Sequence, residues 1–313
     1  MPALIRPAVR EVRSRIFDSA RWAGYRPREG DVVVATFPKC GTTWTQRIVS
    51  MLIAGDAAPA PAPGPWFDFR LGPPVGASLA QAEAASTRRY LKSHLPYDAL
   101  PVYEGVKFIH VARDGRDSAI SFHNHLRGFQ AHMRDVIHAV GESDPKFRGQ
   151  PMPQTPEDPS AFFKGWLIDG GASGDPGASY WEVERSYWAA RREPTMLLVH
   201  YNDLKANPAG EIARIAAFLE IELPAPVMAG ITAAASFDEM KKNGAAILPG
   251  FENVWVNGAD TFLNKGVNGR WKGVYDPADL ELYERRVAEE FSPALAAWLE
   301  DGRLVSGDPA LAD

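Results

Sequence analysis

A lysine, a glycine and two threonines lie close together between Pro38 and Trp44, a segment that reads Pro-Lys-Cys-Gly-Thr-Thr-Trp. It follows a short apolar run and precedes an amphipathic one, so it predicts a tight turn between a buried strand and a helix. Backbone N–H groups at such a helix start converge on a phosphate, and the helix dipole favours the negative charge. Thr42 and Thr43 add hydroxyl donors and Lys39 adds a mobile positive charge. The pattern therefore predicts a phosphate-binding loop.

The position of the lysine distinguishes this loop from the Walker loop of ATP-binding proteins. In the Walker loop the lysine directly follows a glycine and precedes Ser or Thr, whereas Lys39 precedes Gly41. A kinase that uses ATP and magnesium would also need a metal-binding Asp at the end of a buried strand. Asp114 and Asp203 are only loosely placed for that task. Such a kinase is the alternative enzyme, and a turn whose lysine faces solvent is the structural alternative.

Two further segments contain residues suited to proton and phosphate chemistry. Tyr90 to Pro101 holds Lys92 and His94, and a neutral imidazole can accept a hydroxyl proton near neutral pH. Lys107 to His125 predicts a strand that runs into a helix, with Arg113 at the junction and Ser121 about two helical turns further on. A guanidinium suits a phosphate dianion. Taken alone, however, His94 could be structural and Arg113 could pair with Asp114 or Asp117.

Together these segments resemble the cytosolic-type sulfotransferase family, which uses 3′-phosphoadenosine 5′-phosphosulfate (PAPS), and the chain looks like a bacterial member. The matching segments are TFPKCGTTW (Thr36 to Trp44) for the family's TYPKSGTTW, KSHLP (Lys92 to Pro96) for KTHLP, ASFDEMKKN (Ala235 to Asn243) for TSFxxMKxN, and FLNKGVNGRWK (Phe262 to Lys272) for FxRKGxxGxWK. The resemblance runs from about Asp31 to Lys272. It implies the P-loop-like sulfotransferase fold.

The resemblance also implies a role for each matching residue. Lys39 would contact the bridging oxygen and the 5′-phosphate, which Gly41, Thr42 and Thr43 would also hold. His94 would be the general base, and Lys92 would stabilise charge on the sulfuryl oxygens. The donor's 3′-phosphate would contact Arg113 and Ser121, and the segment with Asn264, Lys265 and Gly266 would cover it. Adenine or ribose would contact Trp44, Tyr201, Ser236 and Phe237.

Five substitutions depart from the family pattern, at Phe37, Cys40, Ser93, Ala235 and Asn264, and those at Cys40 and Asn264 concern expected contacts with the donor. Cys40 stands where serine is usual, so a hydroxyl contact is lost although the backbone amide remains to bind the donor. Asn264 stands where arginine is usual, which places some affinity for the donor in doubt. Both positions are still expected to contact the donor.

The expected reaction is an in-line transfer of the sulfuryl group to a hydroxyl or amine of a small, partly apolar acceptor. Catalysis would come from positioning and electrostatics, without a metal. His123 and His125 are poor co-ligands for a metal because residues two apart on a helix point to nearly opposite faces.

The acceptor pocket has four aromatic candidates. Trp66, Phe67, Phe69 and Phe129 could line an apolar pocket or lie in the core. Phenol, aliphatic alcohol, glycolipid and amine all remain open as acceptors, and a non-catalytic nucleotide-binding scaffold is the alternative from another class.

Short apolar runs and longer helical patterns must position these residues. We expect strands at Asp31 to Thr36, Val106 to Ala112 and Thr195 to His200, and helices at Thr42 to Ala54, Arg116 to Phe129, Tyr180 to Arg191 and Pro208 to Glu220. Asn207, Asp276 and Ser292 each precede a proline and predict helix starts. Apolar strands that alternate with helices predict an α/β fold with a central, mostly parallel sheet. We expect one domain over residues 1–313, with loop or lid excursions at about 55–86 and 141–177.

Composition narrows the choice of partners and compartment. The 313 residues include 34 basic and 39 acidic ones, a net charge of −5, so the chain lacks the basic excess of a nucleic-acid-binding surface. With a single cysteine, no signal peptide and no apolar run long enough for a membrane span, we expect a cytoplasmic protein.

The Arg-rich stretch Leu4 to Trp22 predicts a docking helix, with membrane-surface contact as the weaker alternative. Lys272 and Glu281 keep the spacing of the family's dimer segment, but Asp276-Pro277 interrupts it, so a homodimer stays an open alternative.

Overall fold

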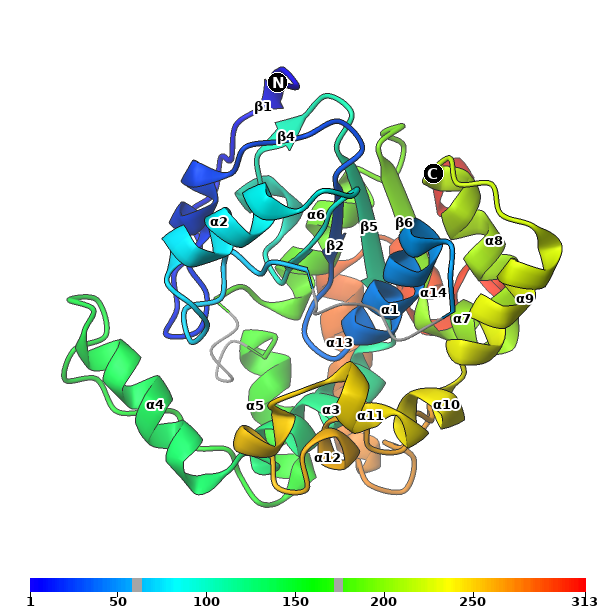
Figure 1. Cartoon of the computed structure of the whole chain (residues 1–313). Coiled ribbons are helices and arrows are strands. Elements are labelled where there is room, and N and C mark those ends of the chain that lie inside the picture. The colour runs from blue at the N-terminus through cyan, green and yellow to red at the C-terminus, as the bar shows by residue number, and fades with distance from the viewer. Residues whose placement is uncertain (58–63, 172–176) are drawn as a thin grey trace.

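The computed structural model describes residues 1–57, 64–171 and 177–313. Its centre is a sheet of four strands in the order β3-β2-β5-β6 (Figure 1), and every neighbouring pair in that sheet is parallel. The strands are β2 (Val32–Ala35), β3 (Tyr90–Ser93), β5 (Lys107–Ala112) and β6 (Met196–His200). A separate antiparallel pair joins β1 (Leu4–Arg6) to β4 (Val102–Tyr103). The expected α/β fold with a central parallel sheet is confirmed.

Helices cover both faces of the sheet, which explains why its strands are continuously apolar. Val32 and Val34 face a core that includes residues of α1 (Thr42–Ala54), α8 (Pro208–Phe218) and α9 (Ala225–Ala234). Val33 and Ala35 point to the opposite face, where α5 (Pro159–Asp169), α6 (Tyr180–Ala189) and α14 (Pro293–Asp301) contribute large aromatic side chains. The sheet is therefore a rigid layer between two cores.

Further helices surround this framework. They are α2 (Val75–Ala84), α3 (Gly115–Arg127), α4 (Ala131–Glu142), α7 (Tyr201–Ala206), α10 (Phe237–Lys242), α11 (Gly244–Ile247), α12 (Ala259–Leu263), α13 (Pro277–Glu290) and α15 (Arg303–Ser306). The three helix starts expected at Asn207, Asp276 and Ser292 are confirmed, because each of these side chains accepts a hydrogen bond from a backbone N–H of the first turn.

The two stretches expected to be loops are partly structured, so that expectation was wrong for much of their described length. Between residues 55 and 86 lies α2, and Phe67 and Asp68 are fully buried. Between residues 141 and 177 lies α5, whose Phe163 and Trp166 belong to the core. The abundance of Ala, Pro and Gly concealed these elements, although Asp158 caps α5 directly before a proline, the same signal as at the other helix starts. Residues 58–63 and 172–176 of these stretches lie outside the described residues.

The N-terminal stretch Leu4 to Trp22 does not form the expected helix. Only β1 and a short 3₁₀ helix (Ser19–Gly24) are regular there. Its arginines instead attach the segment to the body of the protein: Arg10 pairs with Asp98 at 2.9 Å and with Glu182 at 2.7 Å, and Arg13 pairs with Asp144 at 2.9 Å. Among the described residues, none of the helices has the length and hydropathy needed to cross a membrane.

Candidate active site

The residues singled out for chemistry follow the carboxyl ends of the four central strands. The loop with Lys39 follows β2, His94 follows β3, Arg113 follows β5 and Tyr201 follows β6. Because the strands are parallel, these ends meet at one edge of the sheet, where open α/β sheets bind their ligands. Side chains far apart in the sequence therefore line one cavity of about 430 Å³.

The loop after β2 has the geometry of an anion site. Lys39 has φ 71° and Gly41 has φ 114°, so the chain bends tightly just before α1 begins at Thr42. A Cβ atom at Gly41 would lie 3.1 Å from the ring of Tyr201, so this position suits only glycine. No side chain caps α1 and its first turn contains no acidic residue. The first amides of the helix are therefore available to a phosphate.

His94 is held in one orientation and one tautomer. Its Nδ1 lies 2.7 Å from the carbonyl oxygen of Thr36. Since a carbonyl oxygen only accepts, Nδ1 carries the proton and Nε2 is left as the acceptor. The His94 backbone N–H also donates to the buried carboxylate of Asp68 at 3.2 Å. The ring thus presents a basic nitrogen in the lining of the cavity.

Burial and positive neighbours keep this imidazole neutral. Desolvation first, then the charges of Lys92 and Lys39, hold the pKa of His94 well below its ordinary value, against the opposing hydrogen bond to Thr36. The hydroxyl of Thr36 also lies 2.5 Å from that of Thr42. A continuous set of hydrogen bonds therefore connects His94 to the start of α1.

Two lysines face the same cavity as His94. The Nζ of Lys39 lies 4.0 Å from the centre of the Phe262 ring, and that of Lys92 lies 3.5 Å from the centre of the Trp66 ring. Burial lowers the pKa of each to about 7, and for Lys39 the nearby charges of Arg113 and Lys92 add to the effect. A bound polyanion would reverse this shift, because it favours the charged ammonium.

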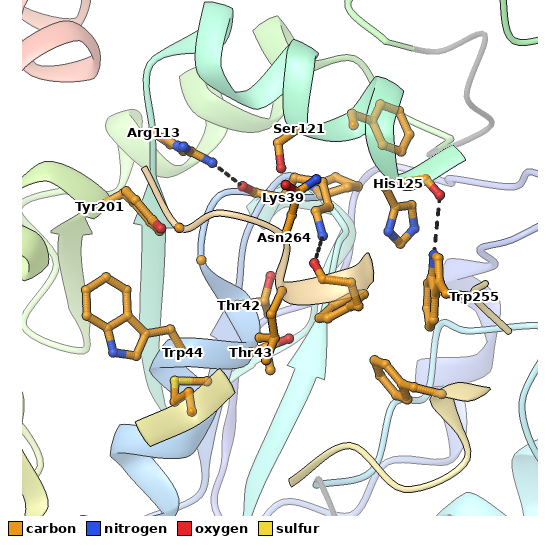
Figure 2. Close-up of a pocket in the computed structure, with 18 of the residues that line it drawn as sticks. Lys39, Thr42, Thr43, Trp44, Arg113, Ser121, His125, Tyr201, Trp255 and Asn264 are labelled. Carbon is orange, nitrogen blue, oxygen red and sulfur yellow. Dashed lines mark hydrogen bonds between the residues drawn. The ribbon is translucent and has the colours of Figure 1, made fainter. Parts of the chain in front are cut away.

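The guanidinium of Arg113 donates to the backbone carbonyl of Lys39 at 3.4 Å, and Ser121 points toward Lys39 from α3 (Figure 2). The guanidinium of Arg113 stacks on Tyr201 at 4.3 Å and donates to the side chain of Asn268 at 2.8 Å. Its Nε is buried without a partner. Asp114 pairs with Arg116 instead, and Asp117 lies 3.9 Å from Arg113. The alternative pairing is therefore wrong for Asp114 and holds for Asp117 only as this longer ion pair, and Arg113 still retains its Nε as a donor without a partner.

The residues expected to contact the adenosine gather beside Tyr201. The Trp44 ring meets the Tyr201 ring edge-on at 5.4 Å, and its Nε1 donates to the carbonyl of Ala235 at 2.7 Å. Ser236 caps α10, and Phe237 lies against Gly266, where a Cβ atom would approach the ring to 2.3 Å. Gly266 and the four residues expected to contact the adenosine all line the cavity.

Two expected donor contacts lie outside the cavity lining. The side chain of Cys40 is fully buried behind the loop, with its Sγ 3.5 Å from the Ser118 hydroxyl. Lys265 is exposed and lines a separate shallow hollow together with Arg127 and Lys241. Asn264 and Gly266, by contrast, do line the main cavity.

The remaining wall of the cavity is mostly apolar and aromatic. Of the four aromatic candidates, Trp66, Phe69 and Phe129 line it, whereas Phe67 lies in the core. Trp66 and Phe69 stack at 4.0 Å. The other apolar side chains of this wall are Ile16, Phe17, Leu71, Phe122, Leu126, Met133, Phe251, Val254, Trp255 and Phe262.

Several lining residues were not expected from the sequence. Arg270 lies within electrostatic range of Arg113, and Lys205 donates to the carbonyl of Gly266 at 2.6 Å. His125 and Trp255 enter from α3 and from the segment before α12. Arg270 sits inside the matched segment FLNKGVNGRWK, so its charge was a usable signal. Trp255 reaches the site through a bridge with Phe129, which no local pattern reveals.

The histidines dismissed as metal ligands are indeed separated. His123 donates from Nε2 to the carbonyl of Pro156, 2.9 Å away, while His125 lines the cavity. Within the described residues, no group of three or more His, Cys, Asp or Glu side chains could hold a metal ion.

Comparison with known proteins agrees with this geometry. The family model of the sulfotransferase domain matches residues 29–293. The chain is 28% identical to the glycolipid sulfotransferase of Mycobacterium bovis (strain BCG / Pasteur 1173P2) over 311 residues, covering 93% of this chain and 94% of that protein. It is also 28% identical to sulfotransferase 1A1 of Rattus norvegicus over 271 residues, covering 83% of this chain and 84% of that protein.

Solved structures share the fold. A mouse sulfotransferase complexed with PAP superimposes with a TM-score of 0.66 at 21% identity, covering 90% of each chain. Retinol dehydratase in a complex with retinol and PAP gives a TM-score of 0.65 at 21% identity, covering 88% of this chain and 85% of that one. Since the family model spans most of the sequence, this chain belongs to the sulfotransferase domain family.

Proposed function

We propose that this sulfotransferase moves the sulfuryl group of PAPS onto a hydroxyl, or an amine, of a small and partly apolar acceptor. The observation that carries the proposal is the convergence of Lys39, Lys92 and His94 on one cavity beside an uncapped helix start. The lining of the cavity combines hydrogen-bond donors for anions with many aromatic side chains. This combination suits a charged nucleotide donor and an apolar acceptor.

The binding site for PAPS follows from the fit between the anionic groups of PAPS and the hydrogen-bond donors of the cavity. We assign the 5′-phosphate to the amides of Gly41, Thr42 and Thr43, and the adenine to the side of the cavity with Trp44, Tyr201, Ser236 and Phe237. The buried unpaired Nε of Arg113 supports a 3′-phosphate beside Arg113 and Ser121. Cys40 can contribute only its backbone, because its thiol is turned away.

The transfer step requires one base and one cation at the leaving oxygen. In the proposed step, Nε2 of His94 takes the acceptor's proton as the acceptor oxygen bonds to sulfur. The bond from sulfur to the bridging phosphate oxygen breaks in line with this attack, and adenosine 3′,5′-bisphosphate leaves. Lys39 meets the negative charge that grows on the bridging oxygen, and Lys92 meets the sulfuryl oxygens.

We also propose one domain for the chain and a cytoplasmic location. The site draws residues from Ile16 to Arg270, and α13 and α14 cover one face of the same sheet, which supports one domain. A lone, buried Cys40 is compatible with a reducing compartment. For a homodimer through the segment 272–281 there is little support, because Asp276 caps α13 where an extended segment would be needed.

Adenosine 3′,5′-bisphosphate is expected to bind tightly without magnesium, and Arg113→Ala is expected to weaken it about 10- to 100-fold, as for a lost charge-assisted hydrogen bond. Isothermal titration calorimetry measures both affinities, with ATP as the comparison ligand. ATP is expected to bind poorly. A preference for magnesium-ATP would instead support a kinase. Tight binding of the bisphosphate without sulfuryl transfer to a broad acceptor panel would support a non-catalytic scaffold.

Arg270→Ala is expected to weaken adenosine 3′,5′-bisphosphate about tenfold but to leave adenosine 5′-monophosphate nearly unaffected. The reason is that Arg270 lines the cavity near Arg113, so its guanidinium can serve the 3′-phosphate where Asn264 lacks the usual arginine.

A second substitution makes this test specific. If Arg270 replaces the missing arginine, Asn264→Arg should restore the affinity of the Arg270→Ala variant for the bisphosphate. Lys272→Ala, at an exposed position nearby, is the matched control. An equal loss of affinity for both nucleotides in Arg270→Ala would contradict a role at the 3′-phosphate.

A further inference from the structure

His125 is a partly buried histidine that the proposed transfer step does not use. It lies near the end of α3, and its side chain points into the cavity between Lys39 and Trp255 (Figure 2). Aromatic rings surround it: the centres of Trp255, Phe129 and Phe262 lie 5.0, 5.1 and 5.8 Å from the centre of the imidazole. A polar ring therefore stands in the apolar part of the site.

The hydrogen bonding of this ring differs from that of His94. The Nδ1 of His94 is bound to a carbonyl, which makes its Nε2 an acceptor. The Nδ1 of His125 is buried without any partner. Of the two neutral tautomers, the one with the proton on Nδ1 would be less favourable, because a buried N–H donor without an acceptor is rarely tolerated. The favoured tautomer of His125 thus has a bare Nδ1 and an N–H at Nε2.

The charges around His125 keep it neutral. The groups that act on it are Lys39, Lys92 and His94, and burial together with the two lysines holds its pKa well below the ordinary value. A neutral imidazole in an aromatic wall adds little to the binding of a sulfate or phosphate, but it can donate one directional hydrogen bond to an uncharged oxygen.

We propose that His125 donates from Nε2 to a second oxygen of the acceptor, so that the preferred acceptor is a polyhydric molecule with an apolar tail. This inference rests on the proposed function, because the first hydroxyl must lie at His94. A monohydric alcohol would place hydrocarbon against His125 and leave the imidazole unpaired. A sugar-headed acceptor would place one hydroxyl at each histidine.

The test compares two acceptors that share one tail, octan-1-ol and octyl glucoside, at concentrations below micelle formation and with PAPS as donor. The wild type is expected to favour octyl glucoside in kcat/KM. His125→Phe, which keeps an aromatic ring but removes the donor, is expected to reduce that preference about tenfold or more, the usual effect of one hydrogen bond to a substrate. His125→Gln retains an N–H donor and is expected to keep most of the preference.

Controls separate this inference from the proposed function. Phe129→Leu alters the same wall without a polar group, so it should lower kcat/KM for both acceptors by similar factors. Titration with adenosine 3′,5′-bisphosphate verifies that every variant is folded and binds the product. Equal preferences in the wild type and His125→Phe, or a wild type that favours octan-1-ol, would refute the role of His125 while leaving the sulfotransferase reaction intact. Failure of the wild type to sulfate either compound or any phenol would refute both.

Discussion

Replacing His94 with glutamine is expected to lower kcat about 10²- to 10⁴-fold, the range over which general bases contribute. The side chain of glutamine can occupy the space of the imidazole and retain a hydrogen bond, but it cannot take the acceptor's proton near neutral pH. The hydrogen bond from Nδ1 to Thr36 leaves the proton-accepting Nε2 in the cavity lining, which is why the effect should fall on the chemical step. Single-turnover kinetics with saturating PAPS measures it directly.

The affinity for adenosine 3′,5′-bisphosphate serves as the control for His94→Gln. It should stay within about a few-fold of the wild type, because the donor contacts assigned to Gly41, Arg113 and Tyr201 do not involve the imidazole. A variant that loses kcat and product affinity together would indicate a structural role for His94, in keeping with its contact to Asp68. A variant with unchanged kcat would require another base.

The pH dependence of the wild type gives an independent check on the same residue. Burial and the charges of Lys92 and Lys39 lower the pKa of His94 well below 6.5, so the basic form persists to lower pH than for a free histidine. We therefore expect no loss of kcat/KM for PAPS, which reports the groups of the free enzyme, from imidazole protonation as the pH falls from about 8 to about 6, near the ordinary pKa of histidine. An acidic limb centred near the ordinary histidine pKa would contradict the neutral, desolvated environment of His94.

The parts of the fold that could be predicted are those with local signals. Alternation of short apolar runs with helical patterns identified β2, β5 and β6, and a capping side chain before proline identified three helix starts. The carboxyl ends of parallel strands lie at the same edge of a sheet. Lys39, His94, Arg113 and Tyr201 each follow such a strand end, so they could be expected to share one site. Local sequence and sheet topology together were sufficient for that step.

The rest of the site depends on contacts between distant segments. Asp68 lies in a stretch whose composition suggests a loop, yet it accepts hydrogen bonds from Trp22 and from the backbone of His94. Phe129 and Trp255 meet through an isolated bridge between segments that are far apart in the sequence. The N-terminal arginines are paired with carboxylates of the body, which overrides the helical pattern expected there. Such pairings arise from tertiary packing and leave no periodic trace in the sequence.

Lys39→Met is expected to lower kcat/KM for PAPS about 10²- to 10³-fold, the effect of removing one group that stabilises developing charge. The same variant should be more stable than the wild type when the site is empty. Burial, Arg113 and Lys92 lower the pKa of Lys39 from 10.5 to about 7, so the folded state disfavours the charged ammonium. Removal of that charge should raise the Tm by about 2–4 °C, the shift that about 1 kcal/mol produces in a protein of a few hundred residues.

The pH dependence of this stability difference has a definite sign. Between pH 7 and 10.5 the unfolded chain holds a proton on Lys39 that the folded chain has released, so the wild type gains stability as the pH rises through this window. The advantage of Lys39→Met should therefore be largest below pH 7 and shrink toward pH 10. Thermal unfolding of the two proteins over this range measures it. Lys272→Met, at an exposed position, is the matched control and should show no such trend.

Adding the product should reverse the order of stability at neutral pH. The phosphates of adenosine 3′,5′-bisphosphate would restore the charge of Lys39 and raise its pKa, so the wild type should gain more in Tm from the ligand than Lys39→Met gains. Equal gains in both proteins would place Lys39 outside the donor site. The low pKa of Lys39 in the empty cavity is therefore consistent with its proposed role. In the free enzyme the charged ammonium is unfavourable and lowers the stability of the fold. A bound polyanion stabilises this charge, so the same free energy contributes to the affinity for the donor.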